Sequence, residues 1–344
     1  MRSSSPTTPW LIGPKADALF IANAAWPLVA LLLWLNQRVM HTGFDLFLMY
    51  VIGTPHRWLT PGLVANDKER LAARWRTLLF VGAATTAAFF AIWFKTNDIG
   101  LLIMLAYLWN LWHVVSQHAG VVRIYAIAGQ PEKRTSGEAE KYLLRIFMLY
   151  AFLRVGSLGI DFQNAMPLIS WISRFSIDKG VYDAPFLLIP VYLFVREVRA
   201  FDRRLAGKYI HLASVMCNFI AMIAFCHYRM RAWALAVATA NAVFHATEYF
   251  GIVTWSVNRR ADAGKAWFLP ALMKNWTFTL LLFLYAVAGL SFVLVTRRPY
   301  LWMMANTLVA CLHYAYDGVL WKMPAVFKPR AAAPSAVPAA TLGV

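Results

Sequence analysis

The chain has 344 residues, of which 60% are hydrophobic and only 14% are charged, and its mean hydropathy is +0.54. This composition excludes an ordinary soluble globular protein and favours a polytopic helical membrane protein. The formal net charge of +17 at pH 7 does not require a nucleic-acid partner, because Lys and Arg concentrate in alternate loops, as the positive-inside rule describes.

Long apolar runs recur from Ala16 to Trp321 and predict an all-α transmembrane bundle of about ten segments. The predicted spans are 16–36, 44–58, 77–95, 100–122, 142–160, 185–201, 209–228, 232–257, 275–296 and 300–321. No small-residue cleavage site follows the first apolar run, so we expect it to be a membrane helix and not a signal peptide. Residues 1–330 form one transmembrane domain in this prediction, and the Ala/Pro-rich tail, 331–344, is expected to be disordered.

The distribution of Lys and Arg predicts the orientation. An even number of crossings puts both termini on one side, and the loops on that side carry most of the basic residues, so we expect cytoplasmic termini in a bacterial cytoplasmic membrane. The 123–141 loop is then a solvated cytoplasmic connection, and the 161–184 loop is external, with a short interfacial helix. The cysteines, Cys217, Cys226 and Cys311, lie in apolar segments and predict no disulfide.

The second segment contains Gly53, Thr54 and Pro55 directly before His56. Proline removes a backbone donor and disfavours helix at the preceding residue. We therefore expect a break at this point, which membrane proteins tolerate where backbone lines a protein-walled cavity.

The stretch from Trp109 to Tyr125 carries polar side chains at Asn110, His113, Gln117 and His118. Such groups are costly in hydrocarbon, so each is a candidate functional residue. His113 and His118 differ by roughly 140° in an ideal helix. Either a π-bulge turns His118 toward His113, or His118 serves another face.

Two later segments repeat the pattern. His313 and Asp317 are separated by about 40° around a helix, and His245 and Glu248 by about 60°. Asn241 lies one turn before His245. Each segment thus presents an imidazole and a carboxylate on one face.

The predicted depth in the membrane connects these histidines and carboxylates, because they fall in the cytoplasmic halves of their predicted segments. The sequence therefore predicts one buried metal site with ligands drawn from His56, His113, His118, His245, Glu248, His313 and Asp317. Imidazole with carboxylate suits iron, with manganese or zinc as alternatives, and the set is large enough for two ions. The amides of Asn110, Gln117 and Asn241 are expected to fix imidazole tautomers, and Tyr249, Tyr314 and Tyr316 lie beside the ligands in sequence.

Of the other histidines, His41, His211 and His227, the last two have no carboxylate at helical spacing. We expect them to be hydrogen-bonding groups between helices. Arg57 and Arg123 follow His56 and His118 at the cytoplasmic boundary; they either anchor helices among the headgroups or bind an anionic substrate head.

The scattered positions His56, His113, His118, His245 and His313 resemble those of integral-membrane histidine-cluster iron enzymes, which include fatty-acid desaturases, hydroxylases and bacterial carotene-cleaving dioxygenases. The chain has no adjacent His-His pair of the desaturase kind. The resemblance implies a non-haem, di-iron oxygenase, desaturase or hydroxylase acting on a lipid, isoprenoid or carotenoid. It also implies membrane lipids as surroundings and an electron-donor protein as partner.

Two other functions fit the same residues. A membrane-bound acyltransferase would use His113 as a general base beside Asn110 and would work without metal. A proton-coupled or metal-ion transporter would use the buried histidines and carboxylates as a relay. A structural alternative is that His245 with Glu248, and His313 with Asp317, are only local polar pairs. The protease motifs HExxH and GxSxG are absent.

Overall fold

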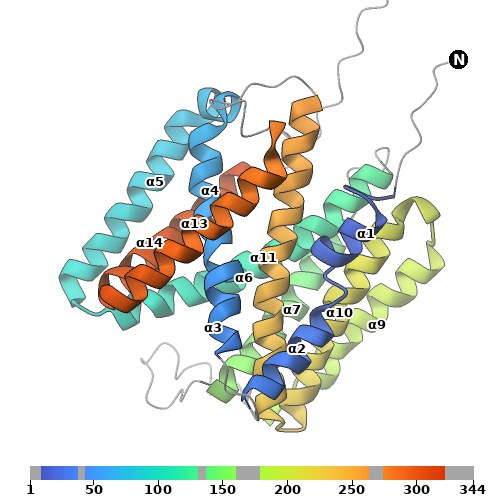
Figure 1. The fold of residues 1–344 in the computed structure, drawn as a ribbon. Coiled ribbons are helices and arrows are strands. Elements are labelled where there is room, and N and C mark those ends of the chain that lie inside the picture. The colour runs from blue at the N-terminus through green and yellow to red at the C-terminus, as the bar shows by residue number, and fades with distance from the viewer. Residues whose placement is uncertain (1–8, 38–42, 131–136, 160–178, 263–273, 322–344) are drawn as a thin grey trace, which may run out of the picture.

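The computed structural model describes residues 9–37, 43–130, 137–159, 179–262 and 274–321 (Figure 1). The regular structure of these residues is entirely helical, which confirms the predicted all-α class. The predicted disordered tail 331–344, most of the 161–184 loop and His41 lie outside the described residues.

The predicted segments coincide with helices, but the first is interrupted at residues 22–25 and several ends shift by more than one helical turn. The elements are α1 (Pro14–Ala16), the π-helix η1 (Asp17–Ile21), α2 (Trp26–Leu35), α3 (Phe44–Leu48), the π-helix η3 (Met49–Gly53), α4 (Thr54–Asn66), α5 (Lys68–Thr96), α6 (Ile99–Gly129), α7 (Glu138–Gly159), α9 (Asp183–Arg199), the 3-10 turn η6 (Arg203–Leu205), α10 (Ala206–His227), α11 (Arg231–Asp262), α13 (Trp276–Arg297) and α14 (Pro299–Leu320). The expected loop 123–141 is shorter than predicted, because α6 continues to Gly129 and α7 begins at Glu138.

Five stretches of the described chain are long and apolar enough to cross a membrane. They are Pro14–Leu35, Leu71–Thr96, Ile99–Gly129, Arg203–His227 and Trp276–Arg297. Each exceeds the roughly 20 residues that a bilayer core requires. This finding supports a membrane protein.

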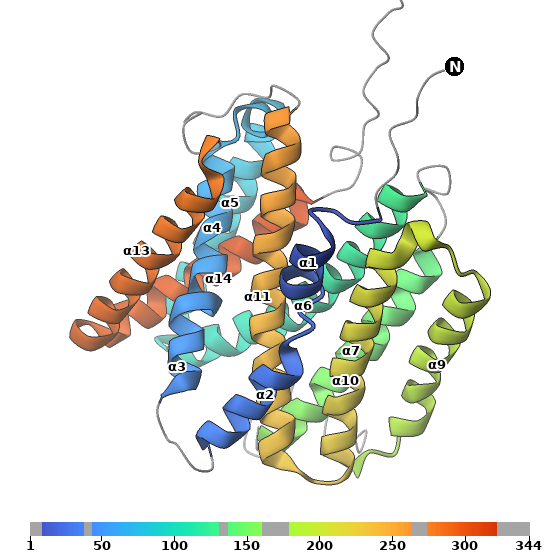
Figure 2. The ribbon, with the colours of Figure 1, turned by 45° about the vertical axis from the view of Figure 1, so that its right-hand side comes forward.

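Helices α6 and α11 run through the middle of the bundle (Figures 1 and 2). Helices α4, α5, α13 and α14 pack together on one side of them, and α2, α7, α9 and α10 pack together on the other. Small buried residues on α11, among them Ala234, Ala236 and Ala240, allow neighbouring helices to approach closely. The two central helices can therefore present side chains to both halves.

The expected break before His56 takes the form of a π-helical turn. Residues Met49–Gly53 form η3, and α4 begins at Thr54 with Pro55 in its first turn. Proline is tolerated there because that N–H would have no partner within the helix. The chain is therefore helical on both sides of this point, with a wider π-helical turn and no unwound segment. This turn sets the direction of His56 on α4.

A buried ion pair joins α7 to α9. Arg154 and Asp183 are 1% and 4% exposed, and Arg154 Nε donates to Asp183 Oδ1 at 2.9 Å. Tyr150 Oη also donates to this carboxylate, at 2.6 Å. The charge of Arg154, which the sequence places inside the membrane, is thus balanced within the bundle.

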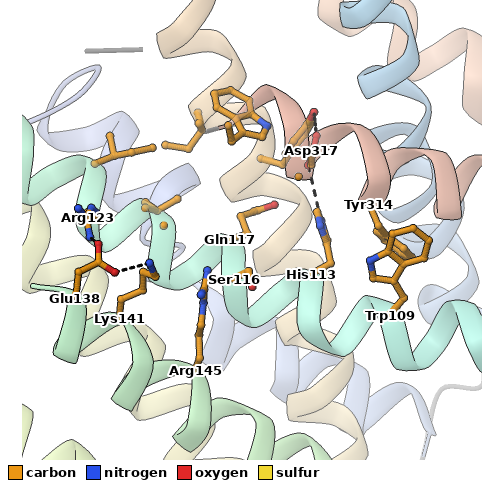
Figure 3. A pocket seen from close by; sticks show the side chains of 17 residues that line it. Trp109, His113, Ser116, Gln117, Arg123, Glu138, Lys141, Arg145, Tyr314 and Asp317 are labelled. Carbon is orange, nitrogen blue, oxygen red and sulfur yellow. Dashed lines mark hydrogen bonds and ion pairs between the residues drawn. The ribbon is translucent and has the colours of Figure 1, made fainter. Parts of the chain in front are cut away.

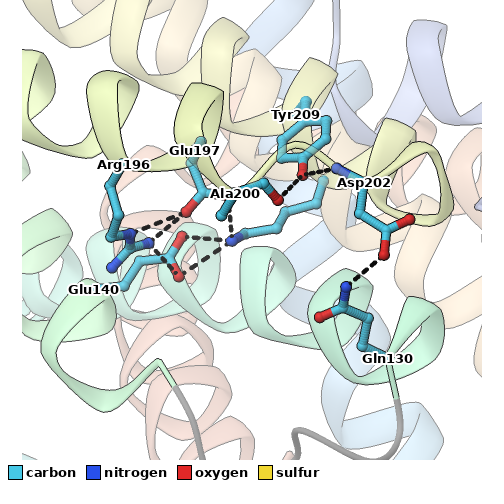
Figure 4. A network of polar contacts seen from close by, with 8 residues as sticks. Gln130, Glu140, Arg196, Glu197, Ala200, Asp202 and Tyr209 are labelled. Carbon is cyan, nitrogen blue, oxygen red and sulfur yellow. Dashed lines mark hydrogen bonds and ion pairs between the residues drawn. The ribbon is translucent and has the colours of Figure 1, made fainter.

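A second ion-pair network joins α7, α9 and α10 near the start of α7 (Figure 4). Lys208 Nζ lies 3.1 Å from Glu140 Oε1 and 2.8 Å from Glu197 Oε2, and Arg196 Nη2 lies 2.8 Å from Glu140 Oε2. Glu140 therefore faces α9 and α10, which fixes the rotation of α7 about its own axis.

A partly buried polar contact continues this network toward the end of α6. Gln130 Nε2 donates to Asp202 Oδ2 at 2.7 Å (Figure 4). The guanidinium of Arg204 holds the pKa of the Asp202 carboxyl well below its usual range, because hydrogen bonds and positive charge favour the ionised form.

Candidate metal centre

Four histidines from four helices meet between the two halves of the bundle. They are His56 of α4, His113 of α6, His245 of α11 and His313 of α14, and all are buried. The ring centroid of His56 lies 5.1 Å from that of His245 and 5.0 Å from that of His313. The ring of His113 lies 5.0 Å from His245 and 4.6 Å from His313. We call these four residues the histidine cluster.

Nitrogen atoms of this cluster lack hydrogen-bond partners within the described part of the chain. Both ring nitrogens of His245, and Nε2 of His56, His113 and His313, are buried in this state. Leaving a buried polar atom unsatisfied costs about 1–3 kcal/mol. Several such atoms at one place call for a common partner, and a metal ion is one that neutral imidazoles bind directly.

The ligand geometry fits a metal ion. One ligand atom from each of His56, His245 and His313 lies within 4.8 Å of the others, and the same holds for His113, His313 and Asp317. Asp317 Oδ2 lies 3.9 Å from His113 Nε2 and 3.7 Å from His313 Nδ1. The two groups share His313, so they form one continuous centre with a carboxylate on one side.

Thr60 is placed to set the tautomer of His313. Its Oγ1 lies 2.6 Å from His313 Nδ1, 2.5 Å from Tyr249 Oη and 3.2 Å from Asp317 Oδ1. The hydroxyl has one proton to donate and two lone pairs to accept with. If it donates to the carboxylate, it accepts from Tyr249 and from His313 Nδ1–H. This arrangement leaves His313 Nε2 without a proton and available as a ligand.

A second group lies beside the cluster and consists of His118, His211 and Glu248, whose ligand atoms also lie within 4.8 Å of one another. All three are fully buried, and Glu248 Oε1 lies 3.0 Å from His118 Nδ1 and 3.1 Å from His211 Nε2. Gln117 Nε2 donates to Glu248 Oε2 at 2.6 Å and to the backbone oxygen of His245 at 2.9 Å. Gln117 therefore connects the two groups through a backbone oxygen and a carboxylate, and not through an imidazole nitrogen as expected.

The two candidate explanations for His118 are resolved by α6, which is a regular α-helix from Ile99 to Gly129 without a π-turn. His118 therefore serves a different face from His113 and joins the second group. The candidate ligands that were predicted to form one site thus fall into two neighbouring groups. The groups are close to each other, because the ring centroids of His118 and His245 are 6.2 Å apart.

Asn241 does not contact an imidazole as expected. Its Nδ2 donates to Oδ1 of Asn218 on α10, at 2.9 Å. Both side chains are buried. The amide therefore joins α10 to α11 and does not position a ligand.

The three tyrosines are divided between two places. Tyr249 bonds Thr60, and the ring of Tyr314 lies 4.9 Å from that of His113. Tyr316 lies against α5 instead, where a Cβ on Gly82 would clash with its hydroxyl oxygen. Its position in the sequence suggested that it lies close to the candidate ligands, but it lies on the face of α14 that packs against α5.

His227 makes the helix–helix contact that was predicted for it. Its Nδ1 lies 2.9 Å from Asp183 Oδ2, and its side chain is 57% exposed. His211 also makes a contact between helices. Its partner is the carboxylate of Glu248 on α11, whereas helical spacing in the sequence reveals only carboxylates on the same segment.

Sequence reasoning missed Thr60 and gave His211 only a structural role. Thr60 lies four residues after His56 on α4, so helical periodicity places it on the same face. His211 lies at the cytoplasmic start of its predicted segment, at the depth of the other ligands. These two signals, position on a ligand-bearing face and common depth, were available in the sequence.

Comparison with known proteins finds no match to this chain among family models, curated proteins or solved structures.

Proposed function

We propose that this protein is a membrane-embedded, metal-dependent oxidoreductase that holds non-haem iron in the histidine cluster. The observation that carries the proposal is the convergence of unpartnered imidazole nitrogens from four helices beside Asp317. Structural needs alone do not explain such an arrangement, because each unsatisfied nitrogen destabilises the bundle unless something binds it.

Two ions per chain account for the two neighbouring groups. The first is held by the histidine cluster with Asp317, and the second by His118, His211 and Glu248. Imidazole and carboxylate ligands with open positions are typical of iron that activates dioxygen. Manganese and zinc remain alternatives that share the same ligand chemistry.

The residues of the chain supply position and protons. Thr60 holds His313 in one tautomer, and Gln117 holds Glu248, so that ligands of both groups keep their direction when a metal is exchanged. Tyr249 Oη lies between Thr60 and Asp317, which makes it a proton donor at the edge of the cluster.

The substrate class follows from the place of the cluster among apolar helices. We infer a lipid, isoprenoid or carotenoid that undergoes oxygenation, desaturation or hydroxylation, with electrons delivered by a donor protein. We place the enzyme in a bacterial cytoplasmic membrane with ten segments and both termini cytoplasmic, because basic residues concentrate in the loops on that side.

Elemental analysis tests the proposal most directly. Protein purified in detergent without chelators is expected to contain about two iron atoms per chain, or to take up that amount from ferrous iron under anaerobic conditions. Removing the metal is expected to lower the unfolding midpoint, because a ligand that binds only the native state stabilises it. Protein that neither contains nor takes up a transition metal would exclude the proposal.

The Thr60→Val variant tests the positioning of His313. Valine has nearly the same shape but can neither accept from His313 Nδ1 nor donate to Asp317. We expect metal affinity to fall by about 10–100-fold, as it does when hydrogen-bond partners of ligating histidines are removed. Thr60→Ser retains the hydroxyl and serves as the control that should keep wild-type affinity. Equal affinities for both variants in a metal-competition titration would contradict this role.

A further inference from the structure

A cavity of about 450 Å³ opens beside the histidine cluster, between α6, α7, α11 and α14. Figure 3 shows His113 and Asp317 at one end and Arg123, Glu138 and Lys141 at the other. The volume is within the range of small-molecule binding sites. The cavity therefore connects the candidate metal centre to a charged mouth.

Among the described residues, three cations and one carboxylate line the cavity toward this end. They are Arg123, Lys141 and Arg145, with Glu138. Lys141 Nζ lies 2.6 Å from Glu138 Oε2, and Arg123 also pairs with Glu138. Arg145 does not pair with Glu138, so its charge is available to an anion that enters the cavity.

Arg145 provides a donor that the protein does not use. Its Nε is buried and has no hydrogen-bond partner among the described residues. Its guanidinium stacks over the Trp112 ring at 5.1 Å from the centroid, which holds the group in one plane. Guanidinium groups held in this way bind carboxylates and phosphates with paired hydrogen bonds.

The mouth lies at an exposed surface of the bundle. Glu138 is 47% exposed, and the side chains of Arg123 and Lys141 are 19% and 20% exposed. These residues flank the short connection between α6 and α7, whereas His113 lies ten residues before Arg123 on α6. At 1.5 Å per residue, the two ends are about 15 Å apart along the helix.

The walls between the two ends are mainly apolar. They include the side chains of Val121 and Ile252, with Trp321, while Ser116, Gln117 and Arg145 add polar groups between the two ends (Figure 3). Burying an unpaired charge against apolar walls is costly. A charged head is thus favoured beside the cations, and an apolar chain along the apolar walls.

We propose that this cavity binds a single-chain amphiphile whose anionic head pairs with Arg123, Lys141 and Arg145. Its apolar chain extends about 15 Å toward the histidine cluster. As a statement about the substrate, this inference rests on the proposed function; as a statement about binding, it depends only on the cavity. Arg57 does not line the cavity, so of the two arginines expected to bind an anionic head, Arg123 alone belongs to this site.

Equilibrium binding to the protein in phosphatidylcholine nanodiscs tests the inference, with empty nanodiscs as the blank. The probes are radiolabelled laurate, dodecyl phosphate and dodecanol, which share a chain and differ in the head. We expect both anions to bind at least about tenfold more tightly than dodecanol. Whichever anion binds more tightly identifies the head as carboxylate or phosphate.

Variants at the mouth should shift affinity in opposite directions. Arg145→Gln is expected to weaken anion binding by about tenfold, and Glu138→Gln to strengthen it, since the first removes a donor and the second removes the competing carboxylate. Arg204→Gln is the matched control, because Arg204 pairs with Asp202 and does not line the cavity. Dodecanol binding should not respond to any of the three variants.

Two results would overturn the inference. One is dodecanol binding as tightly as laurate and dodecyl phosphate; the other is an equal response to Arg145→Gln and Arg204→Gln. Its failure is distinguishable from failure of the proposed function, because the metal-free His313→Ala variant should still bind the anions. If the protein binds the two anions more tightly than dodecanol but takes up no metal, the proposed oxidoreductase function is excluded and the binding inference stands.

Discussion

Replacing His313 with alanine is expected to abolish binding of metal at the cluster while the protein still inserts into membranes. His313 belongs to both three-atom groups of the cluster, and its Nδ1 also contacts Thr60. Alanine keeps α14 helical but removes the only imidazole that the two groups share. We expect the same result for His245 for a different reason: it belongs to one group, and its ring nitrogens make no hydrogen bond within the described chain.

The measurement is metal content per chain after purification, with membrane insertion scored separately by fractionation. His227→Ala is the control, because His227 is 57% exposed and contacts Asp183 outside both groups. Wild-type iron content in His313→Ala would show that the cluster is not the metal site. Metal loss in His227→Ala would show that the loss reports general damage.

Replacing Asp183 with alanine is expected to destabilise the bundle more than any surface change. Arg154 is 1% exposed and keeps its charge, so removing the carboxylate leaves a buried cation poorly compensated. Breaking a buried pair from one side costs about 3–5 kcal/mol. Tyr150 and His227 would also lose the acceptor that they share.

Unfolding in mixed micelles of increasing dodecyl sulfate content, followed by circular dichroism, measures this change. Asp202→Ala is the matched control, since Asp202 also pairs with an arginine, Arg204, but at the exposed end of α10. Solvent screens that pair, so a much smaller change is expected there. Similar losses in the two variants would mean that the Arg154 pair carries no special stability.

From the sequence, the face of each helix that carries candidate ligands could be predicted. The neighbouring helices that these faces contact could not. His313 and Asp317 share a face as their spacing requires, and both take part in one group. His245 and Glu248 also lie one turn apart, yet they belong to different groups, because α11 is central and contacts helices of both halves. Helical periodicity contains no information about the neighbour on each side.

His211 illustrates the same limit. Its depth was readable from the sequence, but its carboxylate, Glu248, comes from α11 and not from its own helix. Thr60 was hidden for a different reason. A threonine in an apolar helix often bonds its own backbone, so its role depends on the arrival of His313 and Tyr249 from distant segments.

The order in which the cluster residues occur along the chain has a consequence for biosynthesis. The four imidazoles come from α4, α6, α11 and α14, and α14 is the last described helix. A ribosome delivers these helices from the N-terminus onward. A nascent chain arrested before α14 would therefore have three of the four imidazoles and no Asp317, so the proposed ligand set is complete only after α14 has been made. A metal ion that needs all four imidazoles would have to bind after the synthesis of α14.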